Sequence, residues 1–278
     1  MRTSSPAIAR QINQGRVRFP RHIAGLPARS SACLGAVAVA AAWLGLGVSP
    51  AAEPGGDAAG VTLAPTAVEF ADLAHYATAN RALPPPAAGE SRVVFLGDSI
   101  TQSWGELQRD YFARIDRINR GISGQATPQM LLRFRADVIA LKPSVVHILA
   151  GTNDIAGNVG PMALEVIEDN IASMVDLARA NCIRVVVGSV LPTTDYPWRH
   201  GLDPGPKIVA LNDWLKRYAR ARHLIFVDYY SALTDGALGI RAEFAPDGVH
   251  PSLAGYRVML PLAEAGIAAA LRQANSRR

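Results

Sequence analysis

Short apolar runs alternate with longer segments of helical periodicity along most of the chain, and few folds accommodate such an alternation. The short runs are rich in β-branched residues and mostly apolar, which is typical of parallel strands buried on both faces of a sheet. Strands are predicted at five places: residues 92–97, 115–119, 145–151, 183–190 and 224–229. Helices are predicted before, between and after them: residues 68–83, 127–141, 161–181, 206–222 and 252–273. The sequence thus predicts the α/β class, a flavodoxin-like three-layer α/β/α sandwich with a central five-stranded parallel sheet.

The first 51 residues have the composition of an export signal. This segment contains six arginines and no acidic residue, and its apolar run at 32–48 is followed by small residues and proline. Ser49 and Ala51 satisfy the small-x-small rule, which predicts signal-peptide cleavage after Ala51. The apolar run is also close to the length that spans a bilayer, so an uncleaved N-terminal anchor is the alternative. We expect an exported protein, periplasmic or secreted, that contacts a membrane only if residues 1–51 are retained.

The rest of the chain divides into a linker and one domain. Residues 52–65 are rich in glycine, alanine and proline and are predicted to be a linker. Residues 66–278 are long enough to bury a sizeable core as a single domain. Since the six N-terminal arginines exceed the net charge of +5, the remaining residues carry a net charge of about −1. Such a domain has no basic excess, and nucleic acid is not expected as a partner.

Polar residues cluster directly after the predicted strands. Residues 97–99 follow the first strand, 119–124 the second, 151–158 the third, and 244–252 follow the fifth after a short connection. The carboxyl ends of parallel strands share one edge of a sheet, where ligands bind. Glycine, asparagine and aspartate are also ordinary turn residues, and a serine after a strand often caps a helix. Their coincidence at one edge of the sheet favours a functional site over separate turns.

The residues at this edge include those that acyl transfer requires. Ser99 is a candidate nucleophile, His250 a candidate general base, and Asp247 a candidate acid that orients the base. Gly121, whose N–H no side chain obstructs, and Asn153, with its amide, are candidate donors to an oxyanion. His200 is the alternative base, although no acidic residue adjoins it in the sequence.

Neither a metal nor an organic cofactor is predicted. The carboxylates and histidine at this edge lack the paired histidine or cysteine spacings that are typical of metal sites. No glycine-rich pattern of the dinucleotide-binding or P-loop kind follows a predicted strand. The chemistry is therefore expected to come from the side chains and backbone of the chain itself.

Four motifs together resemble a known family: GDSIT (97–101), NRGISG (119–124), GTND (151–154) and DGVHP (247–251). They occur in the order of the four blocks of the SGNH, or GDSL-type, esterase superfamily, and the resemblance covers roughly residues 90–273. It implies a cofactor-independent ester hydrolase domain within 66–278 and a triad of Ser99, His250 and Asp247. The oxyanion hole that it implies consists of the Ser99 N–H, the Gly121 N–H and the Asn153 amide.

Aromatic residues near the motifs suggest where substrate binds. Trp104 lies one helical turn beyond Ser99, and Tyr196 and Trp198 follow the fourth predicted strand, so all three are candidates to line the pocket mouth. There they would stack on a sugar face or contact an apolar acyl group, and the alternative is that they only cover the edge of the domain. We expect a small-molecule or glycan ester as the substrate, and most specifically an acetyl ester on carbohydrate. The alternatives are a lysophospholipase or arylesterase activity, and an O-acyltransferase in which a sugar hydroxyl replaces water. The sequence makes no prediction of oligomeric state.

Overall fold

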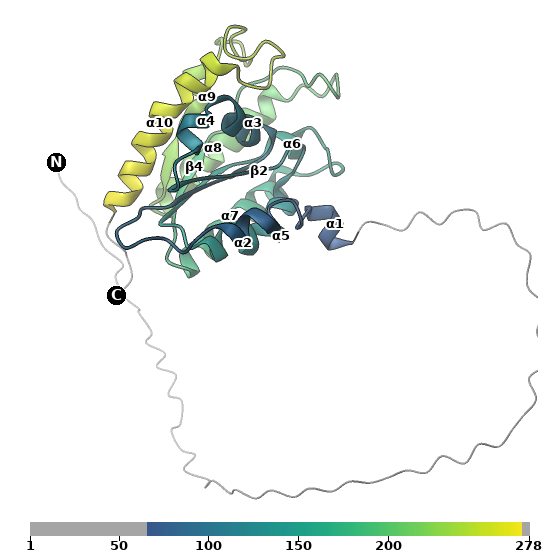
Figure 1. Cartoon of the computed structure of the whole chain (residues 1–278). Helices are drawn as coiled ribbons and strands as arrows, with labels where there is room; N and C mark the ends of the chain where they lie inside the picture. Colours follow the sequence, from purple (N-terminus) through teal and green to yellow (C-terminus); the bar gives the residue numbers. More distant parts are fainter. Residues whose placement is uncertain (1–65, 274–278) are drawn as a thin grey trace, which may run out of the picture. The chain divides into compact units, whose positions relative to one another are not determined.

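The computed structural model describes residues 66–273, drawn in colour in Figure 1. The predicted signal or anchor at 1–51 and the predicted linker at 52–65 lie outside the described residues. Within 66–273, no helix combines the length and the apolar character that crossing a bilayer requires.

A five-stranded sheet with every neighbouring pair parallel forms the centre of the domain, in the order β2-β1-β3-β4-β5. This order and its all-parallel pairing confirm the predicted fold class. The second strand begins at Arg117 and ends at Gly121, two residues later at each end than predicted. The strands are β1 (Val93–Gly97), β2 (Arg117–Gly121), β3 (Val145–Leu149), β4 (Arg184–Gly188) and β5 (Ile225–Val227).

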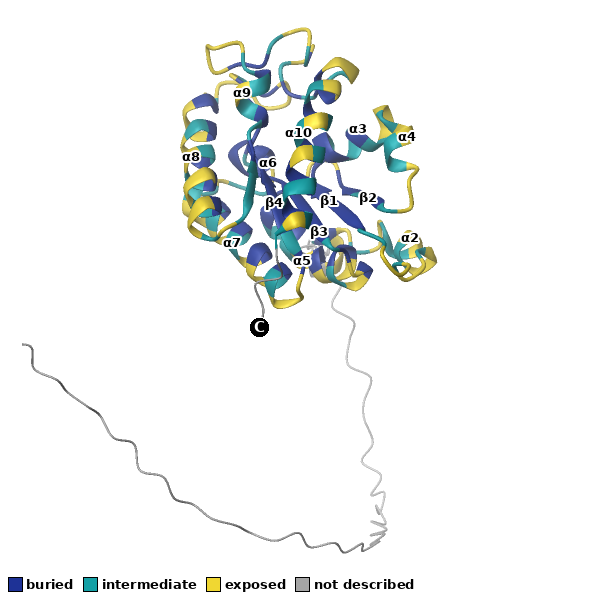
Figure 2. Ribbon diagram, turned by 90° about the vertical axis from the view of Figure 1, so that its left-hand side faces the viewer, coloured by how far each residue is buried: buried dark blue, intermediate teal, exposed yellow. Residues whose placement is uncertain are grey.

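Helices cover both faces of the sheet and define the outer layers. The face that carries Val94 and Leu96 packs against α5 (Thr127–Asp137), α7 (Leu164–Ala180) and α8 (Gly205–Ala221). The face that carries Val93 and Phe95 packs against α3 (Ser99–Leu107), α9 (Tyr229–Leu233) and α10 (Leu253–Arg272). Figure 1 shows α3 and α10 on one side of the strands and α5 and α7 on the other. Figure 2 shows the central strands β1 and β3 buried and the helices exposed along their outer faces, as two-sided burial of a parallel sheet requires.

The segment 68–83 is two short helices, α1 (Ala67–Ala71) and α2 (Ala77–Ala82), and the prediction of one continuous helix there is wrong. Thr66 and Glu69 form a capping box at the start of α1. Asp72 ends the helix in a left-handed conformation with a φ of 50°. The remaining short helices are α4 (Arg109–Phe112), the 3₁₀ turn η1 (Ile139–Leu141) and α6 (Thr152–Ile155).

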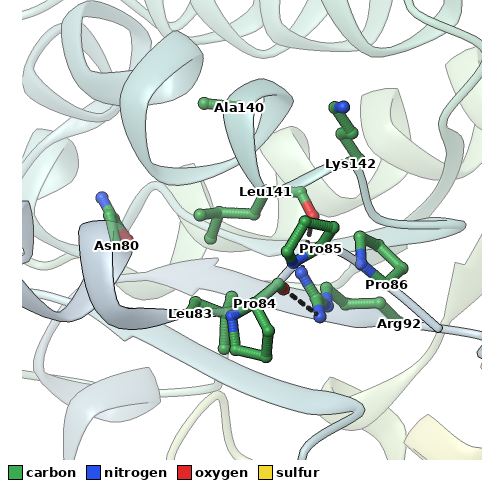
Figure 3. A pocket seen from close by; sticks show the side chains of 9 residues that line it. All are labelled: Asn80, Leu83, Pro84, Pro85, Pro86, Arg92, Ala140, Leu141 and Lys142. Atoms are coloured by element: carbon green, nitrogen blue, oxygen red, sulfur yellow. Dashed lines mark hydrogen bonds between the residues drawn. The ribbon is translucent and has the colours of Figure 1, made fainter.

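A small cavity of about 160 Å³ lies near the amino end of β1, at the edge of the sheet opposite the motifs (Figure 3). Three consecutive prolines, 84–86, form one wall, and Leu141 and Lys142 lie on the other side. The buried Arg92 guanidinium donates hydrogen bonds to the Leu141 and Pro84 carbonyls and to Glu90 Oε1. These bonds attach the proline segment to the sheet, so the arginine has a structural role there.

Candidate active site

Ser99 is the first residue of α3, immediately beyond the carboxyl end of β1. Asp98 caps this helix, because its Oδ1 accepts a hydrogen bond of 2.9 Å from the Ile100 N–H. Burial raises the pKa of the Asp98 carboxyl to about 7, against the opposing effect of that hydrogen bond. A side chain at Gly97 would place its Cβ 2.0 Å from Thr101 Oγ1 and 2.7 Å from the Leu149 carbonyl oxygen. The tight turn that presents Ser99 therefore requires glycine at position 97.

Ser99, His250 and Asp247 form a continuous hydrogen-bonded chain, although the serine lies 151 residues from the histidine. Ser99 Oγ is 3.0 Å from His250 Nε2, and His250 Nδ1 is 2.7 Å from Asp247 Oδ2. A carboxylate only accepts, so Nδ1 carries the proton and Nε2 is the acceptor for the Ser99 hydroxyl. The triad residues named from the sequence therefore lie in the geometry of a nucleophile, its base and the acid that orients the base.

The Asp247 carboxylate also holds the turn that carries His250. Its Oδ1 accepts hydrogen bonds from the backbone N–H groups of Val249 at 2.9 Å and His250 at 2.7 Å. Burial acts to raise the pKa of Asp247, but the hydrogen bonds from the His250 ring and these two N–H groups lower it below its ordinary value. These bonds favour the ionised form of Asp247, which accepts the hydrogen bond from His250 Nδ1–H.

Three donors in the segments that follow β1, β2 and β3 lack a complete set of acceptors. Within residues 66–273, the backbone N–H groups of Ser99 and Gly124 have no hydrogen-bond partner. Asn153 donates one Nδ2 hydrogen to the Gln125 carbonyl at 2.9 Å, which leaves the second hydrogen available. Two backbone donors and one amide are a combination that can stabilise an oxyanion.

The prediction that Gly121 donates to the oxyanion is wrong. Gly121 lies in β2, and its N–H donates to Asn119 Oδ1 at 2.9 Å. A Cβ at this position would lie 2.2 Å from the backbone nitrogen of Gln102, so this glycine lets α3 pack directly on β2. Gly124, the second glycine of the same motif, has a φ of +77° and the unpaired N–H. From the sequence, Gly124 could be identified only as a glycine in a turn, because the sequence does not show which backbone N–H groups have a hydrogen-bond acceptor.

We expect Gly121→Ala to lower the free energy of unfolding by about 1–3 kcal/mol, as overpacking of a filled site does. The obstruction is backbone of α3, which has to shift, so esterase activity should fall with stability. Thermal melting and the rate of ester hydrolysis measure the two effects. Gly89→Ala is the control: its Cβ would meet nothing within 4 Å, and although its positive φ costs roughly 1–2 kcal/mol, it lies before β1 and should leave the activity of the folded protein unchanged. A Gly121→Ala protein with unchanged stability and activity would contradict this assignment.

Trp104 and Tyr196 do not lie at a pocket mouth, and these two predictions are corrected. Trp104 is fully buried against the sheet, where its ring stacks on Tyr256 with centroids 5.5 Å apart, because this position of α3 faces the core. Tyr196 is also fully buried, with its ring 5.1 Å from Trp198. Trp198 is 43% exposed, and its ring centroid lies 5.8 Å from that of His250. Of the three predicted substrate contacts, Trp198 is the one that is exposed beside the triad.

His200 is not the partner of Ser99. Its side chain is exposed, and its Nδ1 lies 2.6 Å from Asp195 Oδ2, so it does have an orienting acid, five residues away in the sequence. The hydrogen bond of Ser99 is to His250. Across residues 66–273, no group of three or more histidine, cysteine, aspartate or glutamate residues could hold a metal ion.

Buried polar side chains fix the loops that surround Ser99. The Arg133 guanidinium, which is fully buried, donates to the Gly97 carbonyl at 2.9 Å and to Gln125 Oε1 at 2.6 Å. Asp154, also buried, accepts from the Thr127 N–H at 2.9 Å and from its hydroxyl. These contacts join the segments after β1, β2 and β3, and they fix the candidate catalytic groups relative to one another.

Comparison with known proteins agrees with this geometry. Residues 95–258 match the model of the GDSL-like lipase/acylhydrolase family. The chain belongs to this family. It is accordingly a carboxylic ester hydrolase, and a small-molecule or glycan ester is the class of substrate that such an enzyme takes.

Individual relatives of this GDSL-like acylhydrolase include proteins of known structure and named esterases. A GDSL-like lipase from Bacteroides thetaiotaomicron is 44% identical, with a TM-score of 0.71 over 73% of this chain and 100% of that one. An acetylxylan esterase from Geobacillus stearothermophilus is 28% identical over 60% of this chain and 90% of its own length. Esterase TesA from Pseudomonas aeruginosa is 27% identical, again over 60% of this chain, and 78% of its length is covered.

Proposed function

We propose that this acylhydrolase is an exported serine esterase that removes short acyl groups, with Ser99, His250 and Asp247 as its catalytic triad. The observation that carries the proposal is the unbroken chain from Ser99 Oγ to His250 Nε2 at 3.0 Å and from His250 Nδ1 to Asp247 Oδ2 at 2.7 Å. The unpaired N–H groups of Ser99 and Gly124 and the second hydrogen of Asn153 Nδ2 support it as oxyanion donors.

The mechanism follows from the proton positions. His250 Nε2 takes the proton of Ser99 Oγ as the oxygen attacks the ester carbonyl carbon. The carbonyl oxygen becomes an oxyanion that accepts hydrogen bonds from Ser99, Gly124 and Asn153, each worth roughly 3 kcal/mol in the transition state. The imidazolium then gives its proton to the alcohol oxygen as the C–O bond breaks, leaving the acyl group on Ser99. Water repeats the sequence, releases the carboxylic acid and restores the serine.

The preferred substrate in this proposal is an acetyl ester on a carbohydrate. The acetylxylan esterase among the relatives supports it, as does the exposed Trp198 ring beside His250, because aromatic faces stack on sugar rings. Export would bring the enzyme to such substrates outside the cell. The arginine-bearing N-terminal segment with its apolar run at 32–48 is the basis for export in this proposal.

Hydrolysis of p-nitrophenyl acetate, butyrate and octanoate tests the acyl-chain preference. We expect kcat/KM for the acetate to exceed that for the octanoate by about tenfold or more, the scale on which a pocket separates substrates by methylene groups. Preference for the octanoate would contradict the short-chain assignment.

A second assay on the same protein distinguishes between the candidate classes of natural substrate. Acetate release from acetylated xylo-oligosaccharides should exceed fatty-acid release from lysophosphatidylcholine. The reverse order would favour the lysophospholipase alternative. Transfer of acetyl to an added sugar faster than to water would favour the acyltransferase alternative.

A further inference from the structure

A chain of side-chain amides leads from the protein surface to the oxyanion donors. The Trp198 indole Nε1–H donates to Asn158 Oδ1 at 3.0 Å. Asn158 Nδ2 donates in turn to Asn153 Oδ1 at 2.8 Å and to the Gly124 carbonyl oxygen at 3.3 Å. Asn153 Nδ2 donates to the Gln125 carbonyl at 2.9 Å. Asn158 therefore contacts both residues whose N–H groups complete the proposed oxyanion hole.

The direction of this chain is fixed by chemistry at its outer end. An amide side chain can present either its oxygen or its nitrogen to a neighbour, but an indole N–H can only donate. Trp198 therefore requires the oxygen of Asn158, which turns the Asn158 nitrogen toward Asn153. Asn153 must then accept with its oxygen, so its own nitrogen faces the opposite way.

The inverted orientation of Asn153 would be inactive. It would place Asn153 Oδ1 against the Gln125 carbonyl oxygen, an unfavourable pair of acceptors, and it would remove the side-chain donor from the oxyanion. Asn153 is 2% exposed, so water cannot readily compensate a wrongly turned amide. The rate of ester hydrolysis therefore depends on the orientation of the Asn153 amide.

We propose that Asn158 and Trp198 are positioning residues that set the orientation of the Asn153 amide and hold it beside Gly124. The inference rests on the proposed function, since it concerns the oxyanion hole of that same site. Neither residue supplies a hydrogen bond to the oxyanion. Their effect should fall on kcat, because the donor they orient acts in the transition state and not in substrate binding.

The same loop offers a matched control. Arg199, next to Trp198, donates to the Gly157 carbonyl oxygen at 2.6 Å and so attaches the loop to the same neighbouring segment. It makes no hydrogen bond with the amides of Asn158 or Asn153. Arg199→Ala therefore removes an attachment of the loop and leaves the amide chain intact.

The experiment measures kcat, KM and melting temperature for Trp198→Phe, Asn158→Ala, their double variant and Arg199→Ala, with p-nitrophenyl acetate. Trp198→Phe keeps an aromatic ring and removes the N–H together with part of the indole's area. We expect kcat to fall roughly tenfold for Trp198→Phe and about 10- to 100-fold for Asn158→Ala, less than the loss of a whole donor, with KM changed less than about threefold. The double variant should be no slower than Asn158→Ala, because both changes break one chain.

Several outcomes would overturn the inference while leaving the esterase proposal standing. One is wild-type kcat in Trp198→Phe and Asn158→Ala, and another is a rise in KM with kcat unchanged, which would make Trp198 a substrate contact. A loss of kcat in Arg199→Ala equal to that of Trp198→Phe would assign the effect to loop attachment. Multiplicative losses in the double variant would show that the two residues act separately. Failure of the proposed function looks different, because the wild-type protein would then lack hydrolysis that depends on Ser99.

Discussion

Replacing Ser99 with alanine should lower kcat for p-nitrophenyl acetate by roughly 10⁴- to 10⁶-fold, the range seen when the nucleophile of a serine hydrolase is removed. The change deletes one hydroxyl, whose hydrogen bond is to His250, at the first position of α3. Alanine is a good helix former, so the melting temperature should change little. Hydrolysis rates together with thermal melting separate loss of chemistry from loss of fold.

Ser103, on the same helix, gives the control for this substitution. Ser103→Ala should retain activity within about twofold, as substitutions away from buried or bonded positions do. A fluorophosphonate probe should add its mass to the peptide that contains Ser99 in the wild type, and this mass should be absent from Ser99→Ala. Labelling at another serine, or more than about 1% of wild-type kcat in Ser99→Ala, would contradict the nucleophile assignment.

Asp247→Asn should lower kcat by roughly 10³- to 10⁴-fold, because the amide changes which ring nitrogen of His250 carries the proton. An asparagine that keeps its oxygen on the Val249 and His250 N–H groups turns its Nδ2 donor toward His250 Nδ1. Nδ1 then accepts, Nε2 is protonated, and the base has no lone pair for the Ser99 hydroxyl. The rate of ester hydrolysis across a range of pH measures the effect.

The pH dependence of the protein's stability that arises from Asp247 has a defined sign. The folded-state pKa of Asp247 is lowered, so its ionised form stabilises the native protein; this contribution is fully present above the unfolded-state pKa and is lost as pH falls through the folded-state pKa. Asp247→Asn should remove this contribution to the loss of stability at low pH. Asp195→Asn is the control, because Asp195 makes a similar pair with His200, which is not hydrogen-bonded to Ser99, and it should leave kcat unchanged. Equal losses of kcat in Asp247→Asn and Asp195→Asn would contradict the assignment of Asp247 to the triad.

The strands could be predicted because burial on both faces leaves a local signature in the sequence. Val93 to Leu96 are all fully buried, and no alternation of polar residues interrupts them. The placement of Ser99, Asn153 and His250 after strands then followed from parallel topology, which brings the carboxyl ends together. These inferences needed only the order of the elements.

Predictions failed where a residue's role depends on partners that are distant in the sequence. Whether the Gly121 N–H is available depends on the rotamer of Asn119 and on the close approach of α3. Trp104 follows Ser99 by little more than one turn. Because of the way α3 packs on the sheet, Trp104 nevertheless faces the core, where its ring contacts those of Phe95 and Tyr256. Hydrogen-bond satisfaction and helix orientation are tertiary properties, and the local pattern did not encode them.

The attachment of Trp198 to Asn158 has a consequence for how such an enzyme changes its substrate. Loops that follow the strands of an α/β sheet normally diversify without disturbing the chemistry below them. Here, the exposed aromatic beside His250 is hydrogen-bonded through Asn158 to Asn153, the proposed oxyanion donor. A lineage, or a library, that replaces this tryptophan to admit a new alcohol group alters turnover in the same step. Recovery would then require a second substitution that restores a hydrogen-bond donor to Asn158, so new selectivity and restored rate should be acquired in pairs.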